Sequence, residues 1–132
     1  MKTSIAVALL SLAILSLSGC SKPDQEAPPA APKVEVVVPK WGPHGTKVGV
    51  GFSVQSTGNS AIWFEQRGIR SAESVEVWFD NTKLGGMAIT PNEGGSAEVP
   101  PALLTKPGKY PVYFVLKPSN QRVDIGLFEI TP

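Results

Sequence analysis

The amino-acid sequence predicts an all-β protein, with one domain folded as a small antiparallel β-sandwich. Short runs rich in Val, Ile and aromatic residues alternate apolar with polar positions, as strands with one buried face do. The 132 residues include 13 Gly and 13 Pro, which stand between these runs as turn residues. No segment has a helical period of useful length. After a leader and a tether are set aside, the length leaves room for one ordinary domain.

Residues 1–19 have the layout of a secretory signal peptide. Met1–Ser4 carries a positive charge at Lys2, and an apolar run from Ile5 to Leu17 follows it. A membrane-spanning helix needs about 20 apolar residues, and this run is shorter. We therefore expect a leader that is removed on export.

The leader ends in the stretch LSGC, formed by Leu17, Ser18, Gly19 and Cys20. This stretch resembles the lipobox of bacterial lipoproteins, and the resemblance implies that Cys20 is acylated and becomes the mature N-terminus. The alternatives are an ordinary signal peptide or an uncut anchor in which Cys20 is only a small apolar residue. Cys20 is the single cysteine of the chain, so an intrachain disulfide is excluded.

Residues 20–33 are predicted to form the lipidated cysteine and a Pro/Ala-rich tether. Ser21–Lys33 contains four prolines and no aromatic residue, so it lacks the apolar side chains needed for a core. It is either a semi-rigid spacer or unselected disordered chain, and its composition fits both. The lipoprotein resemblance also implies sorting: Ser21 follows the cysteine where an Asp would retain the protein at the inner membrane, so the outer membrane is favoured.

Residues 34–132 are expected to form the sandwich. Val34–Val38 is the first predicted strand, and Pro39 with Gly42–Pro43 is expected to close it. Four apolar residues then alternate with Gly and Ser, which predicts a central strand. These residues are Val48, Val50, Phe52 and Val54.

The middle of the domain is predicted to contain four shorter strands. In Ala61–Glu65, Ile62 and Phe64 point one way and Trp63 the other. A hairpin follows, and in its first strand the apolar residues alternate with Glu76, Trp78 and Asp80. The strand segments predicted here are Val75–Asp80, Met87–Thr90 and Ala97–Val99.

The C-terminal third combines a single turn with two strong strands. Pro101–Thr105 is expected to form one helical turn. Tyr110–Lys117 alternates apolar residues on one face, and the last strand begins with Val123. Its alternation shifts by one position at Phe128, which predicts a β-bulge near Leu127.

Two stretches of this domain carry a resemblance to a known family. Gly49–Phe64 (GVGFSVQSTGNSAIWF) and Val99–Leu116 (VPPALLTKPGKYPVYFVL) resemble the IPT/TIG group of immunoglobulin-like domains. The most characteristic part is a Val-Pro turn, the pair Leu103-Leu104, Pro107-Gly108 and a Tyr-containing strand. The resemblance implies an early-set immunoglobulin-like sandwich over residues 34–132, and it carries over no catalytic residue.

Composition and motif spacing argue against several classes of function. The chain has 12 Lys and Arg against 11 Asp and Glu with no basic run, so nucleic-acid binding is not expected. His44 is the only histidine, and a structural or solvent-facing role is favoured over a catalytic base. The carboxylates have no metal-ligand spacing, and Gly45–Gly51 lacks the ending of a phosphate-binding loop. We expect no enzyme activity, no metal and no cofactor.

Four aromatic residues are the candidate binding surface: Trp41, Trp63, Trp78 and Tyr113. Trp63 and Trp78 alternate with core-facing residues, so we expect them on an outer face, where an aromatic patch on one sheet could stack on sugar or contact protein. The alternative, which we favour at this stage, is that the tryptophans are buried on both faces or cap the sandwich edge.

The sequence therefore predicts a membrane-anchored lipoprotein that presents its sandwich to a protein or glycan partner in the bacterial envelope. The sandwich is expected to be periplasmic or surface-exposed. The alternative is a structural accessory subunit of an envelope assembly, such as a secretion or pilus apparatus, that pairs through an open sheet edge. A hydrolase subunit is the least favoured class, because no nucleophile or acid–base constellation is visible.

Overall fold

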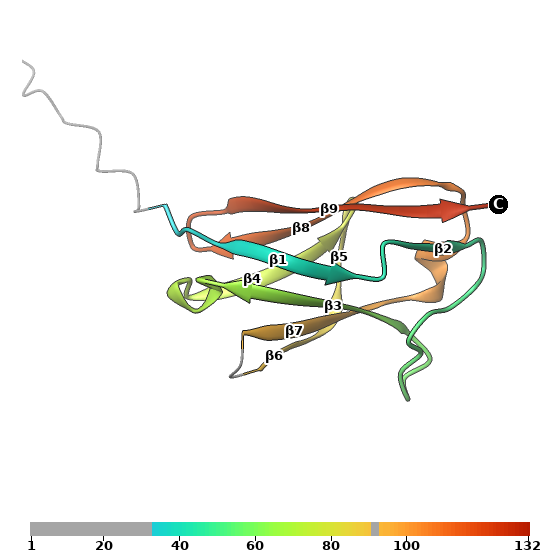
Figure 1. Ribbon diagram of the computed structural model, residues 1–132, viewed down its shortest axis with the longest axis horizontal. Coiled ribbons are helices and arrows are strands. Elements are labelled where there is room, and N and C mark those ends of the chain that lie inside the picture. The colour runs from blue at the N-terminus through green and yellow to red at the C-terminus, as the bar shows by residue number, and fades with distance from the viewer. Residues whose placement is uncertain (1–32, 91–92) are drawn as a thin grey trace, which may run out of the picture.

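The computed structural model describes residues 33–90 and 93–132, and these residues form two β-sheets packed face to face (Figure 1). The predicted leader, the lipobox Leu17–Cys20 and nearly all of the tether lie outside the described residues. Among those described, no helix has the length and apolar character that a membrane span requires. The strands are β1 (Val37–Gly42), β2 (Gly45–Lys47), β3 (Ser60–Arg67), β4 (Ser74–Phe79), β5 (Thr82–Lys83), β6 (Gly85–Ile89), β7 (Gly94–Val99), β8 (Gly108–Lys117) and β9 (Gln121–Thr131).

The strand order within the two sheets is that of an immunoglobulin-like sandwich. The first sheet has the order β1-β3-β7-β6, and the second has the order β2-β9-β8-β4-β5. The first extended segment is divided between them, because β1 pairs antiparallel with β3 whereas β2 pairs parallel with β9. Apart from this parallel pair the ladders are antiparallel, so the predicted fold class is confirmed.

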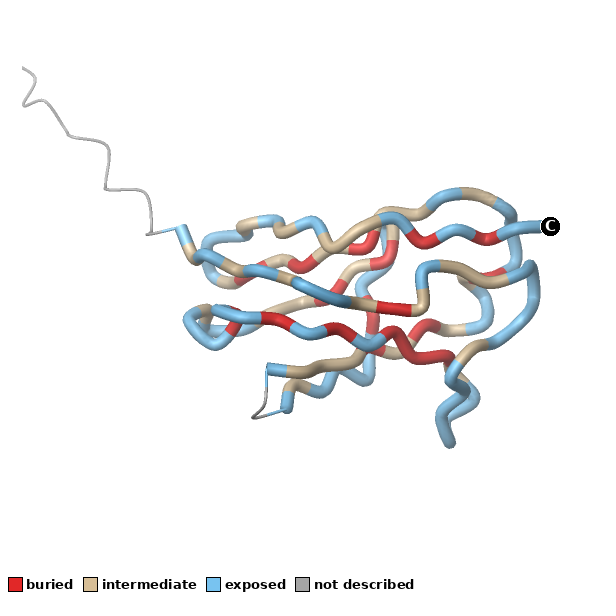
Figure 2. Tube along the Cα trace, viewed as in Figure 1, coloured by how far each residue is buried: buried red, intermediate tan, exposed pale blue. Residues whose placement is uncertain are grey.

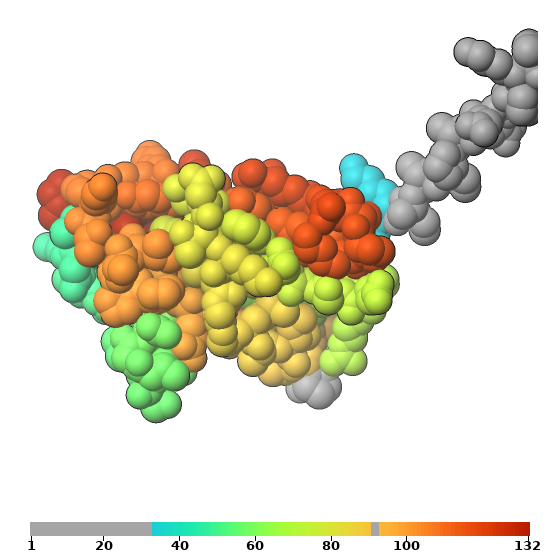
Figure 3. Space-filling view, turned by 180° about the vertical axis from the view of Figure 1, so that it is seen from behind, coloured from blue at the N-terminus to red at the C-terminus, as the bar shows by residue number. Residues whose placement is uncertain are grey.

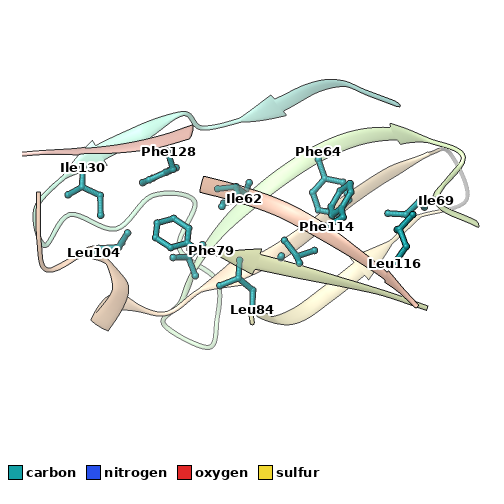
Figure 4. Packing of buried hydrophobic residues seen from close by; sticks show 14 residues of the cluster. Ile62, Phe64, Ile69, Phe79, Leu84, Leu104, Phe114, Leu116, Phe128 and Ile130 are labelled. Carbon is teal, nitrogen blue, oxygen red and sulfur yellow. The ribbon is translucent and has the colours of Figure 1, made fainter. Parts of the chain in front are cut away.

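The core lies between the sheets and is built from alternate residues of the long strands. In β8, Val112, Phe114 and Leu116 are fully buried, and the alternation of buried and exposed positions is visible along the chain in Figure 2. Phe64 of β3 meets Phe114 edge to face at 4.9 Å between ring centroids, which joins the sheets across the middle of the core (Figure 4). Each such side chain contributes about 1.5–3 kcal/mol on burial, so the core forms without a disulfide.

The predicted central strand at Val48–Val54 is wrong: this segment belongs to the long loop between β2 and β3. Val50 and Val54 are 49% and 62% exposed, and only Phe52 of the four alternating residues packs on the core, where it contacts Phe128. The chain leaves β9 directly after β2, and Gly49 adopts a positive φ of 71° that an extended strand does not allow. Alternation with Gly and Ser therefore produced a strand-like pattern without a sheet partner.

The first predicted strand is displaced along the chain. Strand β1 begins at Val37 and runs through Pro39 to Gly42, so Pro39 does not close it. Pro39 is tolerated because β1 is an edge strand, and the pairing with β3 is irregular between Val37 and Lys40. Val34, which was expected in this strand, is instead bonded on both its N–H and its carbonyl by the side-chain amide of Gln121.

The predicted bulge in the last strand is confirmed two residues before its expected position. Val112 pairs with Gly126 whereas Tyr113 pairs with Asp124, so Ile125 is the extra residue. The bulge lets Phe128 and Ile130 be buried while Leu127 is 58% exposed on the outer side. The single turn predicted near Pro101 is also present, as the 3-10 helix η2 (Pro101–Leu104).

Candidate functional site

The four candidate aromatic residues occupy three different places in the sandwich. Trp63 lies on β3 of the first sheet, whereas Trp78 and Tyr113 lie on β4 and β8 of the second sheet. Each of these three alternates with core residues, so the two groups face outward from opposite sheets. Trp41 instead packs against the core. A single patch that contains both Trp63 and Trp78, which the sequence left possible, does not form, because the consecutive strands β3 and β4 belong to different sheets. The favoured alternative, burial of the tryptophans or capping of the sandwich edge, does not hold for Trp63, which is 46% exposed on an inner strand.

Trp41 has a structural role at the end of β1. It pairs with the core residue Phe64, and its indole covers Gly126, where an added Cβ would lie 2.7 Å from the ring. His44 meets the Trp41 ring edge to face at 4.6 Å and lies exposed in the loop that follows. The main-chain carbonyl of His44 accepts a hydrogen bond from the N–H of Glu129. The structure thus places His44 in an exposed loop, as the sequence predicted.

Trp78 and Tyr113 form a stacked row with Arg122, which we call the Trp78 face. The Trp78 and Tyr113 rings are nearly parallel, with 6° between their planes and 6.2 Å between centroids. The guanidinium carbon of Arg122 lies 3.8 Å from the centre of the Tyr113 ring. Because β8 lies between β4 and β9, Tyr113 has Trp78 on one side and Arg122 on the other. The π-faces of Tyr113 are therefore already in contact with protein groups.

The polar groups of the Trp78 face are also paired within the fold. The Trp78 indole N–H donates to Glu76 at 3.0 Å, and the Tyr113 hydroxyl donates to the carbonyl of Asp80 at 2.9 Å. Lys83 donates to the other Glu76 oxygen at 3.0 Å. The Lys83 hydrogen bond, followed by that of Trp78, holds the pKa of Glu76 below its ordinary value. This face is a self-contained network of hydrogen bonds and stacked planar groups.

Trp63 is exposed on the opposite sheet and has small neighbours. Its side chain is 46% exposed, although the residue lies in a strand with partners on both sides. Directly opposite are Gly42 on β1 and Ser96 on β7, and Ala88 of β6 follows in the same row. One edge of the indole covers Gly42, where an added Cβ would lie 3.1 Å from the ring. The Trp78 indole N–H has an acceptor in Glu76, whereas the Trp63 indole lies at the surface.

Charged residues flank Trp63 on the same outer surface, which we call the Trp63 face. Glu65 follows two positions along β3 and lies opposite Lys40. Glu98 lies two residues from Ser96 along β7, opposite Ala61. One oxygen of Glu98 accepts hydrogen bonds from Thr57 at 2.9 Å and Asn59 at 2.8 Å, which ties the β2–β3 loop to this face. That loop is the projecting green lobe in Figure 3.

Sequence analysis identified Trp63 but missed the residues around it. Gly42, Ser96 and Glu98 become its neighbours only through strand pairing. No local pattern joins β1, β3 and β7, because the three strands are distant in sequence and their registers are set by the core. Glu98 could have been noticed as the charged position between the buried residues Ala97 and Val99, which places it on an outer face.

The surface cavities of the described residues include some that lie away from Trp63. One of about 500 Å³ lies where the tether enters, between residues 33–36 and 121–123. Another of about 400 Å³ lies between the β2–β3 loop and η2, lined in part by Val54 and Leu104. No group of three or more metal-ligating side chains is found in the part of the chain that the structure describes.

A scan against protein-family models and a search of curated proteins gave no match to this chain.

Proposed function

We propose that this chain is a lipid-anchored, non-enzymatic binding module of the bacterial envelope, whose immunoglobulin-like sandwich contacts a glycan or protein. The observation that carries the proposal is the exposure of Trp63. An aromatic side chain of this size is costly to leave in water, and exposed aromatic residues on rigid strands are typical anchors of binding sites. The other three candidate aromatics have partners within the fold.

The anchoring part of the proposal rests on the leader and on Cys20. A single acyl chain gives marginal membrane binding, whereas two or more chains hold a protein firmly. The proposal includes membership of the IPT/TIG group and display from the outer membrane, with the sandwich periplasmic or surface-exposed. The strand order is compatible with that group, since its members share the immunoglobulin-like arrangement.

Anchoring is tested by comparing the parent with Cys20→Ala in the native organism or a close bacterial host. We expect the parent in the membrane fraction, with a mature N-terminus whose mass includes acyl chains. The Cys20→Ala protein should lose the acyl mass and leave the membrane fraction. Equal fractionation of the two proteins, with no acyl groups on the parent, would contradict the anchoring proposal.

Binding is tested by recovering envelope components with the full-length protein after mild crosslinking. We expect a saturable envelope component that is recovered with the parent and lost with Trp63→Ala. Leu127→Ala is the matched control, because Leu127 is an exposed apolar residue on the outer side of the second sheet. If the parent recovers no component above the background of an unrelated lipoprotein, the binding function is wrong.

A second candidate is the accessory-subunit role, which β6 favours. This edge strand, Gly85–Ile89, contains no charge and no proline, the features that usually protect an open edge. An assembly subunit could pair there by strand addition, although Arg70 already donates to the carbonyl of Thr90 just beyond the strand. We expect Met87→Lys to lose a partner that pairs with β6 and to retain the binding that depends on Trp63. If Met87→Lys loses the Trp63-dependent component and not a separate partner, the accessory-subunit role is excluded.

A further inference from the structure

We infer that the Trp63 face binds a neutral saccharide, with one sugar ring stacked on the exposed indole. The inference rests on the proposed binding function and names its ligand class. It combines four features of this surface: an exposed aromatic ring, a floor of small side chains, flanking polar groups and a slight excess of negative charge.

The first feature is the space around the indole. In the row that crosses the sheet, Trp63 is flanked by Gly42, Ser96 and then Ala88. Gly42 is buried beneath one edge of the ring, and the other two side chains are too short to reach over it. A flat, rigid ligand can therefore approach the indole, whereas Tyr113 on the opposite sheet has protein groups against its ring. Sugar rings present a C–H face that suits such a surface.

The second feature is the set of hydrogen-bonding groups at the distance of a sugar's hydroxyls. Glu65 lies two residues from Trp63 along β3, and Glu98 lies two residues from Ser96 along β7 in the opposite direction. Two residues of a strand span about 7 Å, so one glutamate lies on each side of Trp63 along the direction of the strands. The Trp63 indole N–H and the Ser96 hydroxyl add groups between them.

The position of Glu98 is fixed by the fold. Thr57 and Asn59 both donate to its Oε2, so Oε1 is left for another donor. Gly86, with φ of 58°, gives the side chain room, since an added Cβ would lie 2.6 Å from two of its carbons. A carboxylate held in one orientation loses less freedom when it accepts a hydroxyl hydrogen bond. The site is therefore partly ordered before ligand binds.

Charge favours a neutral ligand over an anionic one. Nearest to the indole, the Trp63 face carries Glu65 and Glu98 against Lys40. Arg67, two residues beyond Glu65 along β3, forms an ion pair with Glu93 at 3.5 Å and so adds no net positive charge. A phosphate or uronate would meet net repulsion there, whereas the hydroxyl and N-acetyl groups of a neutral sugar can donate to the carboxylates.

Size favours a saccharide over a large protein interface. A stable protein interface buries about 800 Å² per partner around an apolar centre. The strand partners of Trp63 and Glu65 are glycine, serine or charged, so no second large apolar side chain pairs directly beside the indole. One ring on one indole is a contact of small area, and we expect weak affinity that repeated sugar units strengthen.

The test uses the mature lipidated protein in nanodiscs, with a soluble chito-oligosaccharide as the neutral probe. We expect saturable binding by calorimetry that Trp63→Ala weakens by about tenfold or more, a loss equal to about 1.4 kcal/mol. Trp63→Phe should retain part of the affinity, because it keeps an aromatic face. Leu127→Ala should bind as the parent does. Two further measurements, co-sedimentation with purified peptidoglycan and binding to lipopolysaccharide, distinguish the sources of saccharide. We expect peptidoglycan to compete with the probe for the protein.

The outcomes separate the inference from the function on which it rests. Binding of the probe that survives Trp63→Ala would overturn the site. A second result would be a parent protein that binds neither the probe nor the two envelope glycans and still recovers a protein partner that depends on Trp63. That result would contradict the saccharide as ligand but not the binding function. A parent that recovers neither glycan nor protein would remove the proposed function itself.

Discussion

The tryptophans on the outer faces of the two sheets differ in how far they contact the rest of the protein. On the second sheet, Trp78 stacks against Tyr113 and donates its indole N–H to Glu76. On the first sheet, Trp63 has glycine and serine opposite it and is 46% exposed. Both residues alternate with buried neighbours in an aromatic-rich strand, so their local patterns are alike. The cross-strand partners decide whether an outward aromatic stabilises the fold or is left available to a ligand.

The largest effect expected from this contrast is that of Trp78→Ala. The change removes the stack on Tyr113 and deprives Glu76 of a donor, so the free energy of unfolding should fall by about 2–3 kcal/mol. The measurement is denaturant unfolding of the purified protein, followed by circular dichroism. If Trp78→Ala is as stable as the parent, the Trp78 face does not have the structural role assigned to it.

Tyr113→Phe tests the same face with a smaller change. The ring and its stacking remain, but the hydroxyl that donates to the carbonyl of Asp80 is lost. Loss of one such hydrogen bond costs about 1 kcal/mol, which should appear as a shift in the denaturation midpoint at unchanged slope. Tyr110→Phe is the matched control, because its hydroxyl bonds a carbonyl only four residues away in an exposed turn. A larger loss for the control than for Tyr113→Phe would contradict the prediction.

Glu76 gives this face a dependence on pH. Its pKa is lowered by the hydrogen bonds from Lys83 and Trp78, so the ionised carboxylate stabilises the folded state. That contribution is complete above the ordinary carboxyl pKa and is lost as the pH falls through the lowered pKa of the folded protein. Glu76→Gln should flatten the decline of stability in this acid range, measured by urea unfolding at a series of pH values. Lys83→Met should reproduce part of the flattening, and an unchanged profile in both variants would refute the coupling.

The smallest effect on stability is expected for Trp63→Ala. The indole is exposed, so the free energy of unfolding should change by about 0.5 kcal/mol or less. The same denaturant titration used for Trp78→Ala measures it. A stable Trp63→Ala protein that has lost binding sharpens the contrast between the faces. A loss as large as that of Trp78→Ala would show instead that Trp63 supports the sandwich.

Several features of the fold were accessible to sequence analysis because they are local. Alternation in Tyr110–Lys117 predicted the buried side of β8, where three residues are fully buried. The shift of phase near Leu127 predicted a bulge, which the structure places at Ile125. The turn at Pro101–Leu104 was likewise found. Each depends on neighbours within a few residues, where side-chain direction follows the backbone period.

The failures occurred where a partner strand was needed. Val48–Val54 alternates as strictly as β8 does, yet it forms no ladder with another strand and leaves Val50 and Val54 exposed. Its main-chain contacts with strands are isolated hydrogen bonds, such as that from the Val48 N–H to the carbonyl of Thr131. Gly49, Gly51 and Ser53 supply the alternation but no bulk, and positive φ at Gly49 and Ser53 takes the chain out of the extended region. A strand needs a neighbour for its main-chain groups, and no single segment contains that information.

The sequence by itself determined the class of the domain, its core-facing residues in the long strands and the outward direction of Trp63 and Trp78. Only the tertiary structure decided that these two tryptophans belong to opposite sheets, that Trp41 covers Gly126, and that Glu98 lies beside Trp63. The physical reason is that alternation is a property of one strand, whereas a surface is formed by the register between strands distant in sequence. The core fixes that register, and the outer faces follow from it.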